Sequence, residues 1–368
     1  MSVPTARGPI HDGVRCMLMR GGTSKGAYFL ADDLPGDATA RDDLLLRLLG
    51  SPDPRQVDGI GGAHPLTSKV AIVSPSRSPG ADLDYLFLQV VVDQPVVTAG
   101  QPCGNILAGV APFGLERGLL TTDGNGPLAV RIRMVNTGGL AEARFETSGG
   151  RPRYAGSHLI SGVPFPAAPI AITFADTEGA VCGSLLPTGR VRDVLDGVPV
   201  TCIDNGMPVV LVAAGDLGVT GRESCQDLEG HATLPRRVES IRLAAGRAMG
   251  LGDVGARTVP KVTLVSPPSD GGALTTRSFI PHRCHASIGV LAAVSVATAA
   301  VLPGSIAAQV SGAATEPGDG GMRRIRLEHP TGYFDTDVEL DGRGQVTRTS
   351  VISSARKLFD GVAWPRES

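Results

Sequence analysis

The sequence predicts an α+β fold built from two similar halves. Strand-like runs dominate the first half, so strands and helices do not alternate regularly as they do in α/β proteins. Two helix-length apolar segments begin near Asn105 and Val290, and polar residues and a cysteine precede each one. This repetition indicates an internal duplication. Periodicity alone equally allows two ordinary core helices, whose starts are polar because a helix start must be capped or solvated.

The size of the chain fits two domains. Its 368 residues can form two cores, and 42% hydrophobic and 19% charged residues are typical of a globular chain. The composition changes over residues 160–195, which are rich in Pro, Gly and Ala. We therefore expect one domain at residues 1–185 and a second at 186–368, with the last residues of the chain packing back on the first domain.

Charge and composition exclude several classes of partner. The net charge is −2 and there is no long basic cluster, so we expect no nucleic acid partner. Residues 1–12 are polar and unlike a signal peptide, and the small residues of 281–304 favour a buried helix over a membrane span. Six cysteines without C-x-x-C spacing imply no disulfide framework, which indicates a reduced, cytoplasmic protein without a membrane partner.

The elements of the first half follow from local patterns. A short helix at 41–49 is ended by Gly50, Ser51 and Pro52. Runs rich in β-branched and aromatic residues predict strands, and an uninterrupted apolar run predicts a buried helix. In chain order, these are strands at 69–73 and 84–93, an apolar helix from Asn105 towards Leu120, and a strand at 128–135.

The second half repeats this plan. Strands at 198–203 and 209–214 flank Asp204-Asn205-Gly206, which has the chemistry of a hairpin turn. The remaining elements, in order, are an amphipathic helix at 239–250, a strand at 261–266 and the second apolar helix at 290–302.

The segment Met19–Gly26 has the glycines of a phosphate loop but not the order of its other residues, because the serine precedes the lysine. Backbone N–H groups of its glycines and the hydroxyls of Thr23 and Ser24 could form a small carboxylate-binding nest. A tight glycine turn is the alternative. A second glycine cluster, Gly59-Ile60-Gly61-Gly62, has no helix after it and is weak evidence for a dinucleotide.

Cys103 stands where the first apolar helix begins. In the stretch Gln101–Leu120, Pro102 stops any helix that precedes the cysteine, and Gly104 lets other groups approach the backbone closely. A helix start favours anions and negatively charged sulfur. This short segment could therefore hold a carboxylate beside an acid/base thiol.

Two further groups of residues could bind a metal or take part in catalysis. His282 and His285 flank Cys284, and histidine and cysteine are both residue types that bind metals. The spacing in the sequence does not identify a further ligand, so we expect no metal site. Lys69 begins a buried-looking strand. A lysine there is usually a solvated charge at a sheet edge, whereas a partly buried amine suits a general base. The residues alone leave these two interpretations of Lys69 open.

Taken together, these motifs resemble the PrpF-like isomerase family, which has the diaminopimelate-epimerase-type fold. The matching segments are Met19–Gly26, Leu66–Ala71, Cys103-Gly104-Asn105 and Ile203–Pro208. Within that family the chain is most similar to the 4-oxalomesaconate tautomerases and isomerases, through Ser51–Gly59, Asp84–Phe87, Cys103–Val110 and Pro281–Gly289. The resemblance spans nearly the whole chain.

The resemblance implies two pseudo-symmetric domains, each a β-barrel-like sheet around a central apolar helix, with both helix starts at a central cleft. It implies cofactor-independent proton chemistry in which Lys69 is the base and Cys103 either positions the substrate or acts as a second acid/base. True epimerases use one thiol per domain. Cys284 is offset in this sequence, which argues against a two-cysteine racemase mechanism.

The reaction implied is the isomerisation of 4-oxalomesaconate, an unsaturated tricarboxylate, in gallate or protocatechuate degradation. Lys69 would remove an allylic proton and return it at another carbon, while N–H groups at Gly104 and Asn105 stabilise the dienolate. The other residues expected to bind substrate are Thr23, Ser24, Asn205, Arg283, His285 and Ser287.

Two alternatives stay open at this point. The first is isomerisation of aconitate, methylaconitate or methylitaconate by the same kind of site. The second is a non-catalytic accessory protein, which the presence of both Lys69 and Cys103 disfavours. A homodimer is the candidate assembly.

Overall fold

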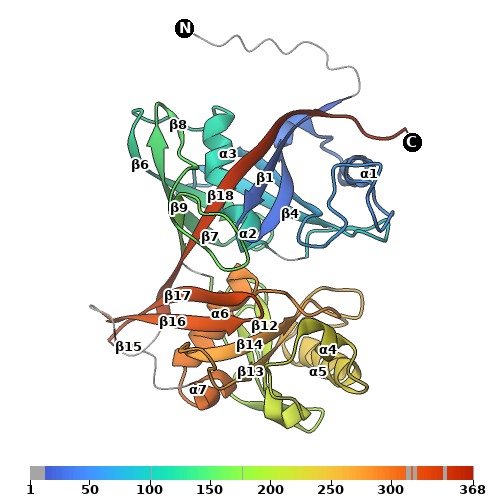
Figure 1. Cartoon of the computed structure of the whole chain (residues 1–368), viewed down its shortest axis with the longest axis vertical. Helices are drawn as coiled ribbons and strands as arrows, with labels where there is room; N and C mark the ends of the chain where they lie inside the picture. The colour runs from blue at the N-terminus through green and yellow to red at the C-terminus, as the bar shows by residue number, and fades with distance from the viewer. Residues whose placement is uncertain are drawn as a thin grey trace.

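The computed structural model describes residues 13–100, 102–175, 177–311, 316–317, 321–342 and 346–367. The polar segment 1–12 and Gln101, which entered the predictions above, lie outside these residues. Two halves are stacked along the long axis of the molecule, and one long strand near the C-terminus, β18 (Val346–Ala363), runs from one half to the other (Figure 1). Within the described residues no helix is long and apolar enough to cross a membrane.

Eight strands close into a barrel in the N-terminal half. In barrel order they are β1 (Val14–Gly21), β2 (Ser24–Leu30), β3 (Lys69–Pro75), β4 (Leu83–Val90), β6 (Gly126–Met134), β7 (Leu140–Ser148), β9 (Pro169–Ala175) and β18. The barrel closes because β18 pairs with β9 on one side and with β1 on the other. The short strands β5 (Val97–Thr98) and β8 (Arg151–Pro152) extend β4 and β7.

Helices lie on both sides of this barrel wall. Inside are α2 (Gly104–Leu107) and α3 (Val110–Glu116), and outside are η1 (Ala31–Asp33) and α1 (Ala38–Leu49). Figure 1 shows α1 to one side of the barrel strands. Residues alternate along β1, so Met17 and Met19 face the inner helices while Val14 and Cys16 pack with α1. The helix expected at 41–49 begins at Ala38, because the Asp37 side chain caps the N–H of Ala40.

The expectation of one continuous apolar helix from Asn105 is wrong. The chain forms α2, turns at Ala108-Gly109 and continues as α3. Pro112 lies inside α3, and its ring has no N–H to donate and would clash with the carbonyl of Ala108 in a continuous helix. The break therefore follows from the proline four residues after Ala108.

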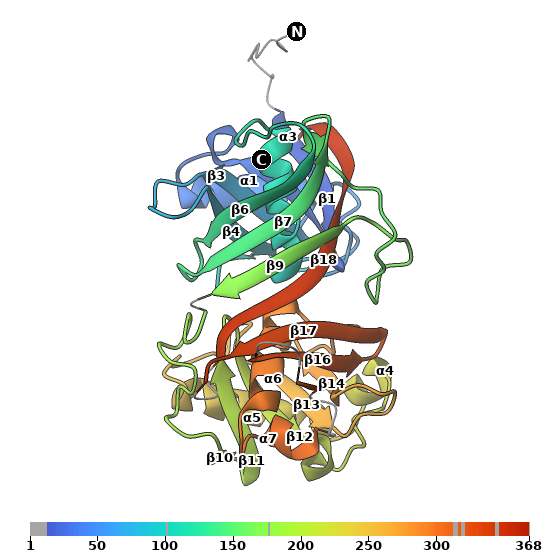
Figure 2. The same ribbon diagram turned by 90° about the vertical axis from the view of Figure 1, so that its left-hand side faces the viewer.

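The C-terminal half has the same plan. Its strands are β10 (Asp193–Leu195), β11 (Val198–Asp204), β12 (Pro208–Ala213), β13 (Lys261–Ser266), β14 (Leu274–Phe279), β15 (Glu316–Pro317), β16 (Met322–His329) and β17 (Gly332–Leu340). Its helices are η2 (Ala214–Leu217), α4 (Cys225–Glu229), α5 (Leu234–Ala248), α6 (Val290–Val301) and α7 (Ile306–Val310). The apolar helix α6 is buried within this half, and α4 and α5 cover the outer face of the sheet (Figure 2).

One predicted boundary in this half needs correction. The amphipathic helix expected at 239–250 is α5, which begins at Leu234 and ends at Ala248. Pro235 lies in its first turn, where a proline costs nothing because the N–H groups there have no intrahelical acceptor.

The strand order confirms two pseudo-symmetric halves. In the first half β2 runs parallel to β3, β3 pairs with β4 in antiparallel fashion, and β4 runs parallel to β6. In the second half β12, β13, β14 and β16 repeat the same three relations. Lys69 and Lys261 are the first residues of the two equivalent strands β3 and β13.

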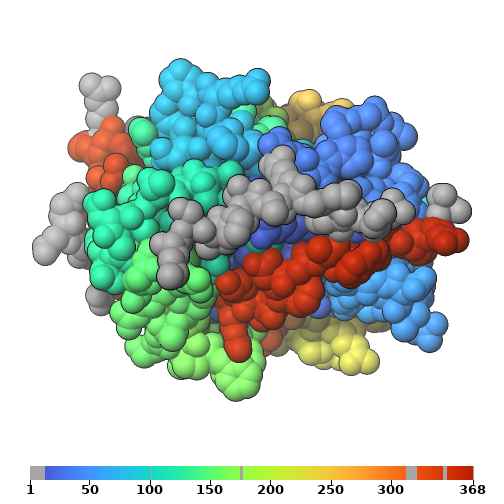
Figure 3. Space-filling view, turned by 90° about the horizontal axis from the view of Figure 1, so that it is seen from above, coloured from blue at the N-terminus to red at the C-terminus, as the bar shows by residue number. Residues whose placement is uncertain are grey.

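The strand β18 belongs to both halves. Residues 346–351 pair with β17, residues 349–354 pair with β9, and residues 355–363 pair with β1. Seen from above, this red C-terminal strand lies across the surface of the N-terminal half (Figure 3). The domain division at residue 185 stays a prediction.

The starts of the two central helices meet between the halves. Gly104 at the start of α2 lies so close to α6 that a Cβ atom there would be 2.7 Å from Cβ of Val290. The absence of a side chain at residue 104 therefore allows the closest contact between the two inner helices.

We predict that Gly104→Ala lowers the free energy of unfolding by about 1–3 kcal/mol, because the added methyl overpacks this contact. Urea unfolding measures the loss. The double variant with Val290→Gly removes both Cβ and Cγ1 of residue 290, the two atoms nearest to the added methyl, and should be more stable than the sum of the two single losses implies. Strictly additive losses would contradict the proposed clash.

Candidate active site

A cavity of about 630 Å³ lies where the two halves meet, a volume typical of small-molecule sites. Its walls come from the loop before β3, from β3 and β4, from the start of α2, from the loop before β13, and from the segment that leads into α6. Both halves of the duplicated fold therefore contribute to one site.

The cavity wall is rich in positive charge. Among the described residues that line it, the basic side chains of lysine and arginine are those of Lys69, Arg257, Lys261 and Arg283. The acidic side chain in the same lining is that of Asp93. This excess of cations suits a small molecule with several carboxylates.

Lys69 is held in a fixed position at the start of β3. Its side chain is buried, Nζ donates a hydrogen bond of 2.8 Å to Oε1 of Gln89, and Nζ lies 5.0 Å from the centre of the Phe87 ring. Gln89 is itself fixed, because its Nε2 donates to the carbonyls of Pro65 and Ser68. The hydrogen-bond partner of Nζ is thus a neutral amide rather than a carboxylate.

Lys261 occupies the equivalent position in the second half. It is buried to the same extent as Lys69, with 6% of each residue exposed, and it lines the same cavity. Burial lowers the pKa of Lys261 to about 7, and the positive charges of Lys69 and Arg242 act in the same direction. The amine and the ammonium forms of Lys261 are therefore both populated near neutral pH.

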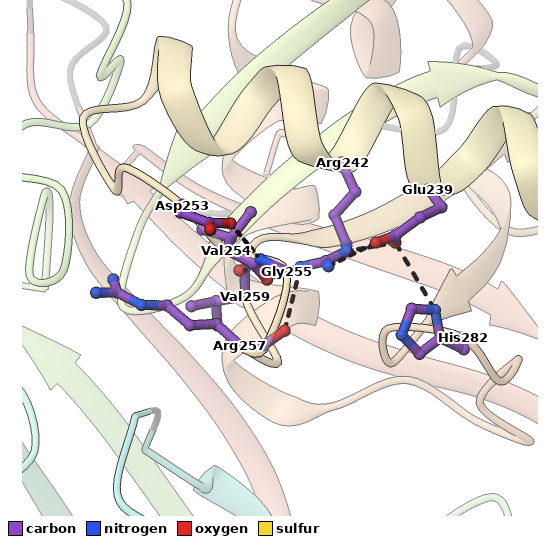
Figure 4. Close-up of polar contacts among 8 residues, drawn as sticks. All are labelled: Glu239, Arg242, Asp253, Val254, Gly255, Arg257, Val259 and His282. Atoms are coloured by element: carbon purple, nitrogen blue, oxygen red, sulfur yellow. Dashed lines mark hydrogen bonds and ion pairs between the residues drawn. The ribbon is translucent and has the colours of Figure 1, made fainter.

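A buried arginine holds the loop that precedes Lys261. The Arg242 guanidinium on α5 donates to the carbonyls of Val254, Arg257 and Val259, and it forms two hydrogen bonds to the carboxylate of Glu239 (Figure 4). The same carboxylate lies 3.7 Å from Nδ1 of His282 (Figure 4). This network ties two parts of the cavity wall to α5.

His285 is a neutral group on the cavity wall. Burial lowers its pKa to about 3, and the charges of Lys69 and Lys261 add to the effect. Its Nδ1 accepts a hydrogen bond of 2.9 Å from the N–H of Ser287. The neutral ring therefore carries its proton on Nε2, which makes that nitrogen a donor.

Cys103 and the first residues of α2 line the same cavity as the two lysines. Cys103 is partly buried, lines the cavity and immediately precedes α2, and its carbonyl accepts a hydrogen bond from the Tyr85 hydroxyl. Gly104 and Asn105 also line the cavity, and the first N–H groups of a helix have no acceptor within the helix.

The Met19–Gly26 segment is the hairpin between β1 and β2, and it packs on the start of α2. The N–H of Thr23 donates to Oδ1 of Asn105, and a Cβ at Gly22 would lie 2.0 Å from the same oxygen. Gly22 also has φ of +51°, which glycine adopts without strain. Ser24 lines the cavity, and its buried hydroxyl has no hydrogen-bond partner among the described residues, whereas Thr23 is not part of the lining.

Other predicted site residues lie in different places. Arg283 is exposed and lines the cavity. The pKa of His64 in the first half is lowered by burial and, after that, by the positive charge of Arg283. Asn205 and Ser287 do not line the cavity. The Asn205 side chain bonds to Thr177 and Thr298, and the Ser287 hydroxyl lies 3.1 Å from Nε2 of His329.

Cys284 also lies away from the cavity lining. It is buried in the outer core beside α4, where burial and the neighbouring Cys225 raise the pKa of its thiol. The cavity wall of the second half carries Lys261 rather than this sulfur.

Nearly the whole length of the chain matches one family of known proteins. Residues 12–365 match the PrpF protein family. The chain belongs to the PrpF family. It is 56% identical to the (4E)-oxalomesaconate Delta-isomerase of Novosphingobium sp. (strain KA1), over 96% of this chain and 98% of that protein. It is also 56% identical to the 4-oxalomesaconate tautomerase of Pseudomonas putida, over 95% of each chain.

Solved structures agree with this family. A crystal structure of methylitaconate-delta-isomerase superposes with a TM-score of 0.79 at 34% identity, covering 96% of each chain. A hydroxyproline epimerase from Agrobacterium vitis superposes with a TM-score of 0.54 at 14% identity, covering 96% of this chain and 93% of that one, which shows a common fold. The PrpF resemblance and the epimerase-type fold predicted from the sequence are confirmed.

In this PrpF protein, sequence reasoning identified part of the cavity wall and missed the rest. Lys69, Cys103, Ser24, Arg283 and His285 were named from motifs, and they line one cavity. The missed residues are Gln89, Arg257 and Lys261. The position of Lys261 at the start of a strand in the second half, matching Lys69 in the first, was the available signal for it.

We predict that stability falls in mild acid because His285 is neutral in the folded protein. An unfolded histidine has a pKa of about 6.5, so below that value the unfolded chain binds a proton that the folded chain excludes until about pH 3. The free energy of unfolding from urea titrations should therefore decrease as the pH falls from about 7 to 5.

The variant His285→Asn should weaken this decrease, because Oδ1 of asparagine can still accept from the N–H of Ser287 but does not titrate. His231→Asn is the matched control, since His231 is exposed and its Nδ1 also accepts backbone N–H groups. An acid dependence that is the same in His285→Asn and in the wild type would exclude His285 as its source.

Proposed function

We propose that this PrpF-family chain is an isomerase that moves a proton and a double bond in 4-oxalomesaconate without a cofactor, during aromatic-acid catabolism. The observation that carries the proposal is a cationic cavity with buried Lys69, in a chain 56% identical along nearly its whole length to two enzymes named for 4-oxalomesaconate. A tricarboxylate complements the excess positive charge of this cavity.

Lys69 is the base in this proposal. Its amine removes an allylic proton, the electron pair spreads into a dienolate, and protonation at another carbon of the conjugated system moves the double bond. The hydrogen bond to Gln89 fixes Nζ, so the amine can be aimed at one carbon of the substrate. A positioned acid/base group typically contributes on the order of 10²–10⁴-fold in rate.

The remaining residues bind the carboxylates and the dienolate. Backbone N–H groups at Gly104 and Asn105 face the developing negative charge. The unpartnered hydroxyl of Ser24 can donate to one carboxylate, with Thr23 beside it in the same hairpin. Arg283 and the Nε2–H of His285 bind another carboxylate from the second half.

Three further residues predicted from the sequence have roles of their own in the proposal. Cys103 either positions the substrate or acts as a second acid/base, since it lines the cavity next to the helix start. Ser287 acts through His285, whose Nδ1 it holds. Asn205 acts through α6, because its N–H and side chain bond to Ser295 and Thr298 of that helix.

Isomerisation of methylitaconate is the second candidate function. The solved methylitaconate-delta-isomerase has the same fold at 34% identity, and its name refers to a different unsaturated acid. We also infer a reducing, cytoplasmic location, because all six cysteines are free thiols. A homodimer stays a prediction.

The test of the function is incubation with 4-oxalomesaconate in heavy water, followed by proton NMR. The expected result is deuterium incorporation together with formation of the isomer, at a rate above that with methylitaconate or methylaconitate. Lys69→Met should lower kcat on the order of 10²–10⁴-fold. Lys357→Met is the matched control, because Lys357 of β18 lies outside the cavity lining and outside the Met19–Gly26 hairpin.

Two outcomes contradict parts of this proposal. A wild-type protein that exchanges no proton of 4-oxalomesaconate would exclude the function. A folded Lys69→Met protein with near wild-type kcat would exclude Lys69 as the base.

We predict that Arg283→Ala raises KM for the tricarboxylate, because it removes a guanidinium that can bind a carboxylate with two hydrogen bonds. Arg283→Lys should recover only part of the affinity, since it lacks the planar fork. Arg236→Ala, on the exposed face of α5, is the control. Steady-state kinetics with unchanged KM in both Arg283 variants would place Arg283 outside the substrate site.

A further inference from the structure

We propose that Arg257 binds the third carboxylate of a tricarboxylate substrate, and that Arg242 is the positioning residue that holds the loop of Arg257 in place. Together they determine the preference of the site for a tricarboxylate over a dicarboxylate. The inference rests on the proposed isomerase function and deepens it, since it names the residues that select the substrate class.

One carboxylate of a bound tricarboxylate has no binding group in the proposed function. Ser24 binds one carboxylate and Arg283 binds another, whereas Lys69 is assigned to proton transfer. The basic side chains that remain in the described lining are those of Arg257 and Lys261. The pKa of Lys261 is lowered by burial to about 7, so this amine is only partly charged near neutral pH. A guanidinium, by contrast, stays charged, and its planar fork matches a carboxylate with two hydrogen bonds.

The Arg257 side chain is placed to bind an anion. The residue is exposed and lines the cavity, and its Nη1 donates a hydrogen bond of 3.1 Å to the carbonyl of Leu251. That acceptor is a neutral carbonyl, and the bond uses one of the five N–H donors of a guanidinium. Figure 4 shows the side chain extending away from Arg242, while the carbonyl of Arg257 faces it. A carboxylate can therefore still bind to this guanidinium.

Arg242 fixes the backbone that carries Arg257. Its side chain on α5 is fully buried, and its Nη1 donates to the carbonyls of Val254 at 3.0 Å and of Arg257 at 3.1 Å (Figure 4). The loop also packs directly on α5, because Val254 fills the space that a Cβ at Gly246 would need. A buried guanidinium is costly unless its donors are bonded, and here they bond to this loop and to Glu239. The loop is therefore held before a substrate binds.

The same network reaches the segment that carries Arg283. Glu239 accepts two hydrogen bonds from Arg242, and its carboxylate lies 3.7 Å from Nδ1 of His282, the residue before Arg283. The two stretches of cavity wall that carry Arg257 and Arg283 are thus both attached to α5. A fixed separation of the two backbones limits the separation of the two carboxylates that the arginines can bind.

This arrangement favours a third carboxylate for a physical reason. A dicarboxylate bound at the other two places leaves the Arg257 guanidinium without a counter-charge, so it gains nothing from that residue. A third carboxylate forms charge-assisted hydrogen bonds there, which are stronger than bonds between neutral groups. Because Arg242 already holds the loop, less backbone freedom is lost on binding, and more of the gain becomes affinity.

The experiment measures the preference for three carboxylates over two in the full-length protein. Titration calorimetry with tricarballylate and glutarate, saturated acids with three and two carboxylates, measures binding without turnover, and steady-state kinetics give KM for 4-oxalomesaconate. We expect Arg257→Gln to weaken tricarballylate binding and to raise KM roughly 10–100-fold. Its Kd for glutarate should stay near the wild-type value. Arg257→Lys should recover part of the loss, because it keeps the charge without the fork.

Arg242→Lys tests the positioning role. A lysine keeps the positive charge but cannot bond to several carbonyls of the loop and to both oxygens of Glu239 at once. We expect the same loss of preference for tricarballylate over glutarate, whereas a loss of stability alone would not change the ratio of the two affinities. Arg247→Gln is the matched control, because Arg247 is an exposed residue of the same helix and lies outside the cavity lining.

The outcomes separate this inference from the proposed function. A wild type that binds tricarballylate preferentially but does not isomerise 4-oxalomesaconate would exclude the function and leave the carboxylate assignment standing. Equal binding of both acids by the wild type, or an unchanged preference in folded Arg257→Gln, overturns the assignment of Arg257. An unchanged preference in folded Arg242→Lys overturns the positioning role. Should that variant fail to fold by circular dichroism, Glu239→Gln carries the test, and an unchanged preference in it has the same meaning.

Discussion

The site depends on the contact between the starts of α2 and α6. Gly104 and Val290 approach so closely that no side chain fits at residue 104, and this contact brings the two halves of the duplicated fold together. The cavity lies beside it, so its floor consists of helix starts whose N–H groups favour negative charge. The strand β18 pairs with both halves and restricts how far they can separate.

Burying cations in this cavity is unfavourable without a ligand. Lys69 and Lys261 are taken out of water, and the lowered pKa of Lys261 reflects this desolvation. A polyanionic substrate supplies the missing counter-charge, so binding relieves a cost that the empty site carries. In the proposed reaction, removal of a proton adds a delocalised negative charge to the bound acid, so cations beside it stabilise the dienolate more than the ground state.

Sequence reasoning predicted the elements whose pattern is local. The helices α1 and α6 and the strands β3, β11 and β13 were found within a few residues. The strand β18 was missed, because its role comes from pairing with partners as distant as Val14 and Phe174, and no local pattern encodes such pairs. The family resemblance identified Lys69, but Arg242 was invisible in sequence, since its importance comes from carbonyls that only the fold brings together.

The two halves have diverged around a common plan. In the first half the lysine at the strand start is anchored by Gln89, and the cysteine before the inner helix lines the cavity. In the second half the cysteine before the inner helix packs in the outer core beside Cys225, and the lysine at the strand start remains in the cavity. Amines from both halves, rather than thiols from both, therefore line the cavity. Each half in this way adds a basic side chain to the wall, and a wall with excess positive charge attracts a polyanion.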